Sequence, residues 1–233
     1  MNSVERVPRV SVIVPTWNEA ETILDCLTSL RAQNPDEIVV ADGDSEDDTC
    51  EIAQTFGAKV VVSTLGRGAR QNRAGEIATG DVFLFLHADC RLALGAIAEL
   101  KRFVGRHPRV PGGCFRMRVD HADLRFRLID AAGHLRAGVF GLPYGDQGIF
   151  VARWAFERVG GFPETRLMDD LLLSARLRRL GRLALLRSTI SVSPRRWLAR
   201  GIFRQTLLNW KLTSLLALGV PPDSLARLYR PAR

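Results

Sequence analysis

Short apolar runs alternate with longer amphipathic segments through the first 110 residues. The runs lie in "RVSVIV", "DEIVVA", "AKVVVS" and "DVFLFLHAD", and helical spacing of apolar residues marks "ETILDCLTSLRAQ", "DTCEIAQTF" and "GARQNRAGEIA" between them. Pro15 is expected to end the first strand. Strands that alternate with helices form βαβ units, and uninterrupted apolar strands are typical of a parallel sheet buried on both faces. The pattern predicts an α/β domain with a Rossmann-like, mostly parallel sheet flanked by helices.

The pattern is less regular after residue 110. We expect an exposed strand in "GGCFRMRVD", a helix in "DLRFRLIDAAGHLRAG" and a glycine-rich loop that enters a strand in "GLPYGDQGIFVAR". A helix in "LMDDLLLSARLRRLGR" ends at Gly181, and a long helix follows "ISVSPRRW" to about Leu218. Since no repeat or low-complexity linker divides the chain, we expect one domain over residues 1–233 with a helical C-terminal extension.

Polar residues follow three of the predicted strands directly. They lie in "PTWNE" after the first strand, "ADGDSEDD" after the second and "HAD" after the fourth. Ligands of open parallel sheets bind at the carboxyl ends of the strands. The sequence therefore predicts that these three segments meet at a functional site.

Several common ligand motifs are excluded. The first strand is not followed by G-x-G-x-x-G, and the chain contains no Walker A sequence, which argues against dinucleotide and P-loop folds. A calcium loop in "DGDSEDD" would need glycine and glutamate where Asp47 and Ala53 stand. Asp47 and Asp48 suit a helix N-terminus instead. Asp42, at the strand end, is not explained in this way.

Two pairs of ionisable residues each allow two interpretations. His87 and Asp89 could together face a divalent cation that holds nucleotide phosphates, or they could be a core histidine and the cap of a helix over "LALGAIAELKRF". Asp169 and Asp170 could cap the helix that they begin, or one of them could act as a general base.

The charge is distributed unevenly. The formal net charge is +8, but the segment from Arg176 to Arg233 holds 13 of the 33 Lys and Arg residues and only one acid, Asp223. Such a basic segment suggests an anionic partner, either nucleic acid, membrane phosphates or a phosphorylated substrate. Few aromatics and no recognition motif accompany the arginines, so we expect no nucleic acid.

The long C-terminal helix carries a basic stripe. At about 100° per residue, Arg196, Arg200, Arg204 and Lys211 fall within an arc of about 80°. Such a helix could rest on an anionic membrane and suit a lipid acceptor, but packing on its own domain is the more common role of an amphipathic helix. The opening residues do not resemble a signal peptide, and no run of apolar residues is long enough to span a bilayer, so we expect a cytoplasmic protein.

The four cysteines are scattered, without Cys-x-x-Cys spacing. Neither a zinc site nor a disulfide framework is therefore expected, and the cysteines are interpreted as reduced and structural.

The order and spacing of the motifs resemble a known family. Over about residues 8–200, "VSVIVPTWNEA", "IVVADGDSEDDT", "GARQNRAGEIATGDVFLFLHADC", "GGF" and "MDDLLLSARLRRLGR" look like the successive motifs of the family 2 glycosyltransferases, which have the GT-A fold. The compact length, "LHADC" and the C-terminal segment look most like the small bacterial branch associated with radical-SAM proteins or arsenosugar biosynthesis. The resemblance implies a nucleotide-binding half at about residues 8–110, an acceptor-binding half at about 111–195 and basic helices at about 196–233.

The resemblance also implies roles for residues of the first half. Those implied to line the pocket of a nucleotide-sugar donor are Pro15, Thr16, Glu19, Asp42, Arg70 and Asp89. Asp42 would hydrogen-bond the base, usually uracil, and Arg70 would lie over the base or its phosphates. Asp89 corresponds to the last aspartate of the family's D-x-D motif, which holds Mg²⁺ or Mn²⁺. His87 departs from that motif and is a second candidate ligand.

In the second half, the resemblance makes Asp170 the base that deprotonates the acceptor, with Asp169 as a positioning partner. A single base and a single cation are sufficient for in-line transfer with inversion. The acceptor would be a small molecule or a lipid that offers a hydroxyl or a carboxylate.

Two further segments fit the family less fully. "SPRRW" resembles a shortened arginine-tryptophan motif, which makes Arg195, Arg196 and Trp197 candidates for phosphate or acceptor contacts. "PYGDQGIF" places Asp146 and Gln147 near the acceptor, unless this segment is only a surface turn.

Because the D-x-D motif is incomplete, a catalytically weak module that binds nucleotide sugar or membrane is the alternative function. The sugar, the choice between uridine and guanosine, and the oligomeric state stay open.

Overall fold

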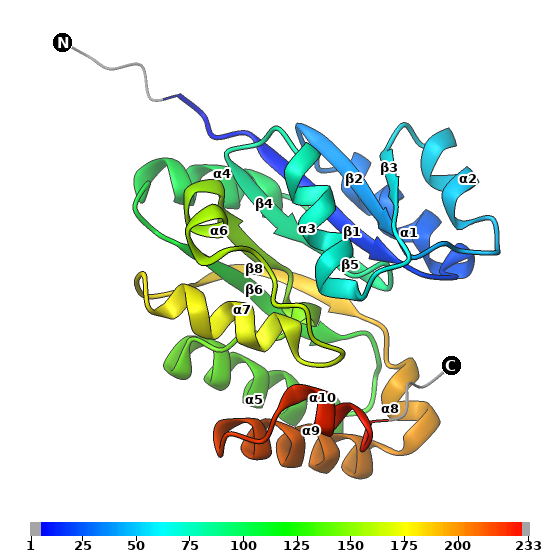
Figure 1. Ribbon diagram of the computed structural model, residues 1–233, viewed down its shortest axis with the longest axis vertical. Helices are drawn as coiled ribbons and strands as arrows, with labels where there is room; N and C mark the ends of the chain where they lie inside the picture. Colours follow the sequence, from blue (N-terminus) through cyan, green and yellow to red (C-terminus); the bar gives the residue numbers. More distant parts are fainter. Residues whose placement is uncertain (1–5, 230–233) are drawn as a thin grey trace.

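The computed structural model describes residues 6–229, and within them eight strands form one sheet (Figure 1). The strands are β1 Val10–Thr16, β2 Glu37–Asp42, β3 Lys59–Val62, β4 Val82–Phe85, β5 Cys90–Leu92, β6 Gly112–Val119, β7 Ile149–Ala152 and β8 Ala184–Val192. Their order across the sheet is β3-β2-β1-β4-β7-β6-β8-β5. The first four are parallel, β7 is antiparallel to both β4 and β6, and β8 runs parallel to β6 and antiparallel to β5. The α/β class predicted from the sequence is confirmed.

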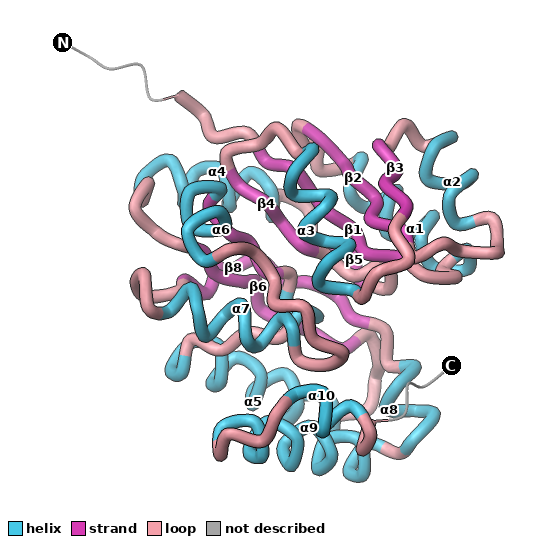
Figure 2. Tube along the Cα trace, in the orientation of Figure 1, coloured by secondary structure: helices cyan, strands magenta, loops and turns pink. Residues whose placement is uncertain are grey.

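Helices cover both faces of the sheet (Figure 2). The helices are α1 Ala20–Arg31, α2 Thr49–Thr55, α3 Arg67–Ile77, α4 Ala96–Arg106, α5 Arg125–Phe140, α6 Arg153–Val159, α7 Asp169–Arg178, α8 Arg195–Arg200, α9 Ile202–Ala217 and α10 Pro222–Ala226, with a 3-10 turn, η1, at Gly145–Gln147. Helices α5, α9 and α10 lie together at the end of the molecule opposite the N-terminus (Figure 1). In the described part of the chain, none of these helices combines the length and the apolarity that a bilayer-spanning helix needs.

Two hydrophobic clusters explain why the strands contain uninterrupted apolar runs. On one face, Val12 and Leu84 pack with residues of α1 and α4, such as Leu27 and Leu100. On the other face, alternate strand residues such as Phe83 pack with residues of α3, α6 and α7. Because each strand contributes to both clusters, the alternation of apolar and polar residues that marks a half-exposed strand is lost.

Strand β1 runs through Pro15 to Thr16, so the prediction that Pro15 ends it was wrong. The Ile13 carbonyl accepts a hydrogen bond from Leu86 on the β4 side. Two residues later the Pro15 nitrogen points to that same side, where β4 has already ended at Phe85. Proline therefore interrupts no ladder hydrogen bond here, and β1 continues its pairing with β2.

Three other expectations are corrected. The segment after Asp89 is the short strand β5, so Asp89 does not cap a helix over residues 92–103. Strand β6 is mostly buried, because it lies between β7 and β8 rather than at an edge. The long C-terminal helix is divided by Gly201, whose φ of 85° ends α8 before α9 begins. The predicted basic stripe therefore does not lie on one helix.

All four cysteines are free, as expected, and Cys26, Cys90 and Cys114 are buried.

Candidate active site

A cavity of about 580 Å³ lies where the carboxyl ends of β1 and β4 approach α7 and the C-terminal helices. Its walls come from loops of the sheet, from the first turns of α3 and α7, from α8 and from α9 and α10. The lining residues are Trp17, Arg67, Arg70, His87, Tyr144, Asp146, Arg166, Leu167, Met168, Asp170, Leu171, Arg196, Asn209, Leu212, Ala226 and Tyr229. Four of them are arginines and two are aspartates, so the cavity suits an anionic ligand.

The loops that follow β1 and β2 are fastened to each other. Asp42 is fully buried, and its carboxylate accepts hydrogen bonds from the Ser45 amide at 2.9 Å, the Ser45 hydroxyl at 2.5 Å and the Thr16 hydroxyl at 3.2 Å. Asp47 accepts hydrogen bonds from the backbone of Ala20 at 3.0 Å and of Thr49 at 3.1 Å, at the starts of α1 and α2. This agrees with its predicted position at a helix N-terminus. The polar residues here hold the loops in shape.

Arg70 reaches across the end of β1 to the cavity. Its Nη1 donates to the Thr16 carbonyl at 2.7 Å, while its buried Nε lacks a partner. Gly43 permits this approach, because a Cβ at that position would lie 1.7 Å from Nη1 of Arg70. Burial lowers the pKa of Arg70 below its usual range. Only a glycine at this position of "ADGD" leaves room for the guanidinium.

Arg67 and Asp169 form an ion pair between the first turns of α3 and α7. Arg67 Nε donates to Asp169 Oδ2 at 3.1 Å, and a second contact joins Nη2 to Oδ1. The Asp169 side chain is only 3% exposed. Burial acts to raise the pKa of Asp169, but the Arg67 guanidinium outweighs it and the pKa lies below the ordinary value. Asp169 thus stays ionised and holds the start of α7 against α3.

Asp170 follows Asp169 and faces the cavity. Its Oδ2 accepts a hydrogen bond from the Gly145 amide at 2.6 Å, and its Oδ1 accepts one from the Leu171 amide at 2.8 Å. A Cβ at Gly145 would lie 2.5 Å from His87 Nε2 and 3.1 Å from Asp170 Oδ2. Gly145 therefore lets the turn η1 pass between the two side chains, and brings the segments around residues 87, 145 and 170 together.

Asp146, in the turn η1, is a second carboxylate in the cavity. Burial raises its pKa to about 6, although Arg136 acts in the opposite direction. Its Oδ1 is buried without a hydrogen-bond partner. Among the described residues, Arg70 Nε and Asp146 Oδ1 are the unpartnered buried polar atoms that belong to the cavity lining. Such atoms are uncommon in folded proteins, and here they mark where polar ligand atoms would bind.

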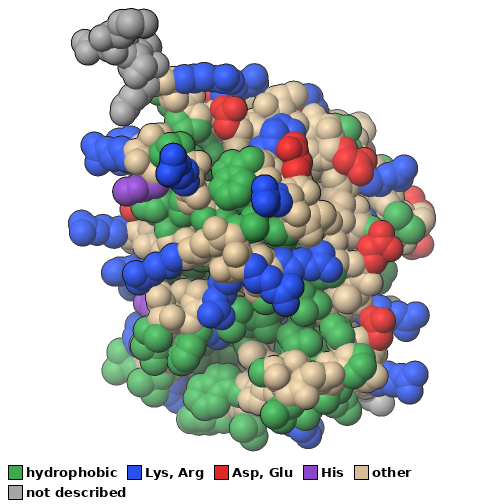
Figure 3. Space-filling model, turned by 60° about the vertical axis from the view of Figure 1, so that its left-hand side comes forward, with side chains coloured by type: hydrophobic (Ala, Val, Ile, Leu, Met, Phe, Trp, Pro, Cys, Tyr) green, Lys and Arg blue, Asp and Glu red, His purple; other side chains and the backbone are tan. Residues whose placement is uncertain are grey.

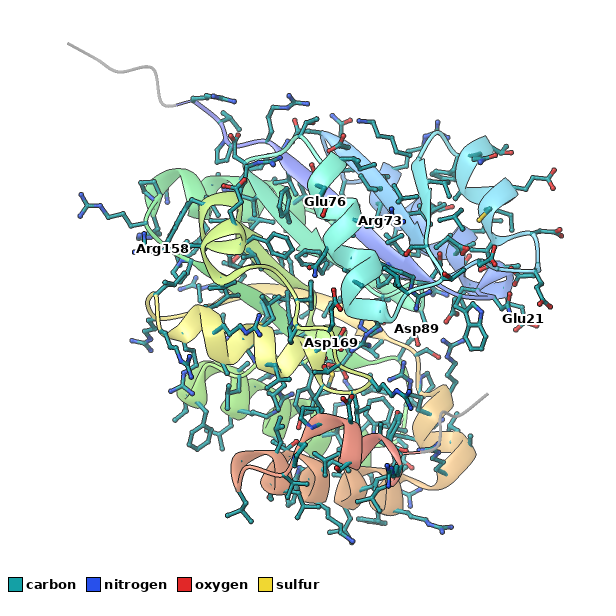
Figure 4. All side chains as sticks on the ribbon, in the orientation of Figure 1. Glu21, Arg73, Glu76, Asp89, Arg158 and Asp169 are labelled. Carbon is teal, nitrogen blue, oxygen red and sulfur yellow. The ribbon has the colours of Figure 1, made fainter. Side chains whose placement is uncertain are left out.

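His87 and Asp89, the two candidate metal ligands, lie in different surroundings. Burial, and then the nearby Arg67, lower the pKa of His87 to about 4, so its ring is neutral at pH 7. Asp89 Oδ2 lies 3.3 Å from Arg195 Nε, and Arg195 Nη2 lies 3.1 Å from both carboxylate oxygens of Glu19. Figure 4 shows Asp89 on the side of the N-terminal sheet and Asp169 at the start of α7, across the same central region.

The donor set can be tested against a divalent cation. A neutral imidazole and a carboxylate are both suitable ligands. In the described part of the chain, however, no group of three or more His, Cys, Asp or Glu side chains is placed to hold a metal. A divalent cation at this site would therefore have to take most of its ligands from substrate phosphates and water, the usual manner of Mg²⁺ binding.

Nine predicted site residues are not part of the cavity lining, namely Pro15, Thr16, Glu19, Asp42, Asp89, Gln147, Asp169, Arg195 and Trp197. Three of them are also engaged elsewhere in the fold. Gln147 is fully buried and its side chain is engaged with Arg136 at 3.0 Å and with the Tyr144 amide at 3.2 Å. Trp197 packs in the hydrophobic cluster against Phe126, with the ring centroids 6.2 Å apart. Pro15 is part of β1 and precedes the cavity residues. Arg196, next to Trp197, does line the cavity.

Several lining residues were not predicted from the sequence. They are Trp17, Arg67, Tyr144, Arg166, Asn209 and Tyr229. Arg67 carried a usable signal, because a cation in the first turn of a helix is unfavourable unless an acid compensates it. Asn209 and Tyr229 carried none, since they come from a segment without a local motif.

Comparison with known proteins identifies the family. The sequence model for "Glycosyl transferase family 2" matches residues 11–157, which is more than half of the chain. This chain belongs to glycosyl transferase family 2.

Two named relatives share part of this sequence. A PGL/p-HBAD biosynthesis glycosyltransferase from Mycobacterium bovis (strain BCG / Pasteur 1173P2) is 34% identical over 110 residues, which cover 43% of each chain. Glycosyltransferase AglE from Haloferax volcanii is 35% identical over 95 residues, 36% of this chain and 31% of the relative. The chain thus spans less than half of the length of these relatives.

The fold of this chain recurs in solved structures. The mannosyltransferase PcManGT from Pyrobaculum calidifontis, solved with GDP-Man and Mn²⁺, superposes with a TM-score of 0.69 and 21% identity over 97% of this chain and 66% of that one. S. aureus TarS 1-349, solved with UDP-GlcNAc, gives a TM-score of 0.63 and 21% identity over 79% and 58%. At this level of identity the two neighbours establish the GT-A fold of this chain.

Proposed function

We propose that this protein transfers a sugar from a nucleotide diphosphate sugar to an acceptor, with inversion at the anomeric carbon. The observation that carries the proposal is the composition of one cavity. It combines Arg67, Arg70, Arg166 and Arg196 with the Asp170 carboxylate, at the carboxyl ends of the strands. Arginines suit a diphosphate because their planar guanidinium groups can donate two hydrogen bonds to one phosphate. Membership of glycosyl transferase family 2 supports sugar transfer as the type of reaction.

Asp170 is the proposed base. Its side chain is 17% exposed, so solvent or an acceptor can reach it, while the Gly145 amide fixes its position. Attack by the acceptor oxygen on the anomeric carbon requires removal of one proton on the acceptor side. A single displacement of this kind leads to inversion and requires no covalent intermediate. Asp169 positions Asp170 through its ion pair with Arg67.

Asp89 and His87 are the proposed ligands of Mg²⁺ or Mn²⁺. A divalent cation bound with the diphosphate would offset the negative charge that develops on the leaving group. Arg195 forms ion pairs with Asp89 and Glu19. If Asp89 binds the metal ion instead, the Arg195 guanidinium would provide further positive charge beside the phosphates. This assignment uses a single carboxylate, in agreement with the incomplete D-x-D motif.

The base of the donor is proposed to be uracil, bound near Trp17, Thr16 and Asp42. Oδ1 of Asp42 accepts one hydrogen bond and Oδ2 accepts two, so Oδ1 can accept one more, but Asp42 is fully buried and direct contact with the base requires the loop to open. Trp17 is 52% exposed at the rim of the cavity, where its ring could stack on a base. A cytoplasmic location and membership of the radical-SAM or arsenosugar branch rest on the sequence alone and stay predictions.

The first test is ligand binding. Thermal unfolding is followed with UDP, GDP and ADP, each with and without Mn²⁺. We expect UDP to stabilise the protein most, and mainly when Mn²⁺ is present. Asp89→Asn should lose the dependence on Mn²⁺, whereas Glu21→Gln, on the outer surface of α1 (Figure 4), should keep it. Absence of stabilisation by every nucleotide would overturn the donor site.

The second test is turnover. Release of nucleoside diphosphate is measured from UDP-sugars and GDP-sugars with a panel of small-molecule and lipid acceptors. Asp170→Asn should keep nucleotide binding but lose transfer by about 10²–10⁴-fold, the usual contribution of a general base.

The alternative function is a binding module with little activity, and Asp89 supports it because Arg195 already occupies that carboxylate. Binding of UDP without turnover by the unmodified protein would favour this alternative.

A further inference from the structure

The outward face of α9 is apolar. Exposed apolar residues include Phe203, Leu207 and Trp210, which are spaced by three or four residues along this helix, and Leu218, which follows its last residue. Phe203 is 72% and Trp210 60% exposed. A surface helix of a globular protein normally turns its charged residues outward. Here large apolar side chains project to solvent beside the charged ones.

The neighbouring helix α5 repeats this arrangement. Apolar residues at exposed positions include Leu124, which caps the helix, and Leu128, Ala131, Leu135 and Val139 within it, again spaced by three or four residues. Arg125 and Phe140 are exposed as well. The two helices contact each other, and the Tyr144 hydroxyl is hydrogen-bonded to Thr213 of α9 at 2.5 Å. Hydrophobic side chains accordingly dominate the lower part of the molecule, where α5 and α9 lie (Figure 3). We call these outward residues of α5 and α9 the apolar face.

The charged residues of α9 are both basic. Arg204 and Lys211 lie among the exposed residues of this helix, which contains neither Asp nor Glu. The acids near α5 are neutralised locally, because Asp130 pairs with Arg127 at 2.8 Å and Asp123 pairs with Arg125 at 2.5 Å. An apolar face with tryptophan, phenylalanine and uncompensated cations matches the interfacial region of an anionic bilayer.

The inward side of α9 belongs to the candidate active site. Asn209 and Leu212 line the cavity, while Trp210 and Lys211, between them in sequence, point outward. A surface bound to the apolar face would thus be only the thickness of one helix away from the cavity.

We propose that the protein docks on anionic phospholipid membranes through the apolar face of α5 and α9. The apolar side chains enter the interface, and Arg204 and Lys211 contact lipid phosphates. A second copy of the chain is a less suitable occupant, because face-to-face pairing would oppose the cations of both copies without acids between them. Docking does not depend on sugar transfer. Its consequence, that the cavity opens beside a lipid acceptor, rests on the proposed function.

Co-sedimentation with vesicles tests the proposal. Vesicles of phosphatidylcholine mixed with phosphatidylglycerol are compared with vesicles of phosphatidylcholine alone. The protein should bind the anionic vesicles, and its tryptophan fluorescence should shift to shorter wavelength as Trp210 leaves water. Arg204→Gln with Lys211→Gln should weaken this binding roughly tenfold or more, since each basic residue near such a surface contributes about 1 kcal/mol.

A matched pair of triple variants tests whether vesicle binding requires the apolar face or any exposed hydrophobic residues. Phe203→Ser, Leu207→Ser and Trp210→Ser should abolish binding, whereas Val7→Ser, Leu24→Ser and Leu65→Ser, at exposed positions elsewhere, should leave it unchanged. Thermal unfolding with and without UDP checks that both variants are folded. Asp170→Asn should bind vesicles like the unmodified protein, so a failure of docking is distinct from a failure of transfer.

Any of three results would overturn the proposal. The first is equal loss of binding in both triple variants, and the second is equal binding to both kinds of vesicle. The third is a concentration-dependent dimer in light scattering that only the α9 variant abolishes, without vesicle binding, which would assign the apolar face to a second copy.

Discussion

The N-terminal sheet and the C-terminal helices contribute to the same cavity in different ways. In the sheet half, Asp42, Thr16 and Asp47 are largely engaged with neighbouring backbone and side chains. In the C-terminal part, α9 reaches the cavity with Asn209 and Leu212 and α10 with Ala226, while large apolar side chains on the outer side of α9 are exposed.

This difference suggests a division of labour. Loops that are fixed by internal hydrogen bonds form a preorganised surface, which suits a donor of constant structure. Helices that lie at the edge of the fold and have few buried residues of their own suit an acceptor that is held in a membrane. Two arginines form ion pairs between the sheet half and later parts of the chain, Arg67 with Asp169 of α7 and Arg195 of α8 with Glu19 and Asp89, and these pairs differ in burial.

The largest expected effect comes from breaking the buried ion pair. Arg67→Met leaves the Asp169 carboxylate buried without its guanidinium, and should lower the free energy of unfolding by about 3–5 kcal/mol. Arg195→Met removes a more exposed arginine, 44% against 34% for Arg67, but leaves Asp89, whose side chain is 8% exposed, without that partner, and should cost less, about 1–3 kcal/mol. Urea denaturation at pH 8 measures both.

The double variant Arg67→Met with Asp169→Asn provides the control. Because it removes both charges, it should recover most of the stability that Arg67→Met loses. Equal losses in Arg67→Met and Arg195→Met, or no recovery in the double variant, would contradict the assignment of Arg67 and Asp169 as the principal link.

The same division appears in what the sequence could predict. The strands and helices up to β4 were predicted close to their bounds, because buried parallel strands leave uninterrupted apolar runs. Helix α6 and strand β8 were not predicted. The exposed and buried residues of β8 follow no regular alternation, since it has Arg187, Ser188 and Thr189 at its centre and lies one strand from the edge of the sheet.

For the site, strand ends and family motifs selected His87, Asp170 and Arg70, which do line the cavity. They did not exclude Trp197 and Gln147, which pack inside the fold, because an arginine-tryptophan pair or a polar loop gives no information on which side chain turns inward. Nor did they find Asn209 and Tyr229, whose role depends on how distant helices pack.

Replacement of Asp146 tests whether its buried negative charge lowers the stability of the protein. Its pKa of about 6 lies above that of an ordinary aspartate, so the protonated form is favoured by folding. The stabilisation is complete below about pH 4 and is lost as the pH rises through about 6. At pH 8, Asp146→Asn should therefore be more stable than the unmodified protein, by at most about 3 kcal/mol.

Urea denaturation at a series of pH values measures this gain. The difference between Asp146→Asn and the unmodified protein should be absent at pH 4, grow up to about pH 6 and then level off. Asp120→Asn, at an exposed position, is the control and should show almost no difference. A gain that does not change with pH would mean that burial of the charge is not its cause.

The smallest expected effect comes from Gly43→Ala, which tests whether Arg70 contributes to UDP binding from its present position. In Gly43→Ala the new methyl group would lie 1.7 Å from Arg70 Nη1, but the guanidinium is the end of a flexible side chain and can turn away. Loss of its hydrogen bond to the Thr16 carbonyl should leave the fold intact and weaken UDP binding roughly tenfold, as expected for one hydrogen bond of a charged donor.

Gly66→Ala is the matched control for this prediction. Its Cβ would meet no atom within 4 Å, although Gly66 directly precedes α3, the helix that carries Arg70. Titration calorimetry with UDP and Mn²⁺ should therefore give the same affinity for Gly66→Ala as for the unmodified protein. If Gly43→Ala also kept full affinity, Arg70 would not be a donor contact in its present position. The preorganised part of the cavity would then be limited to the loops held by Asp42 and Asp47.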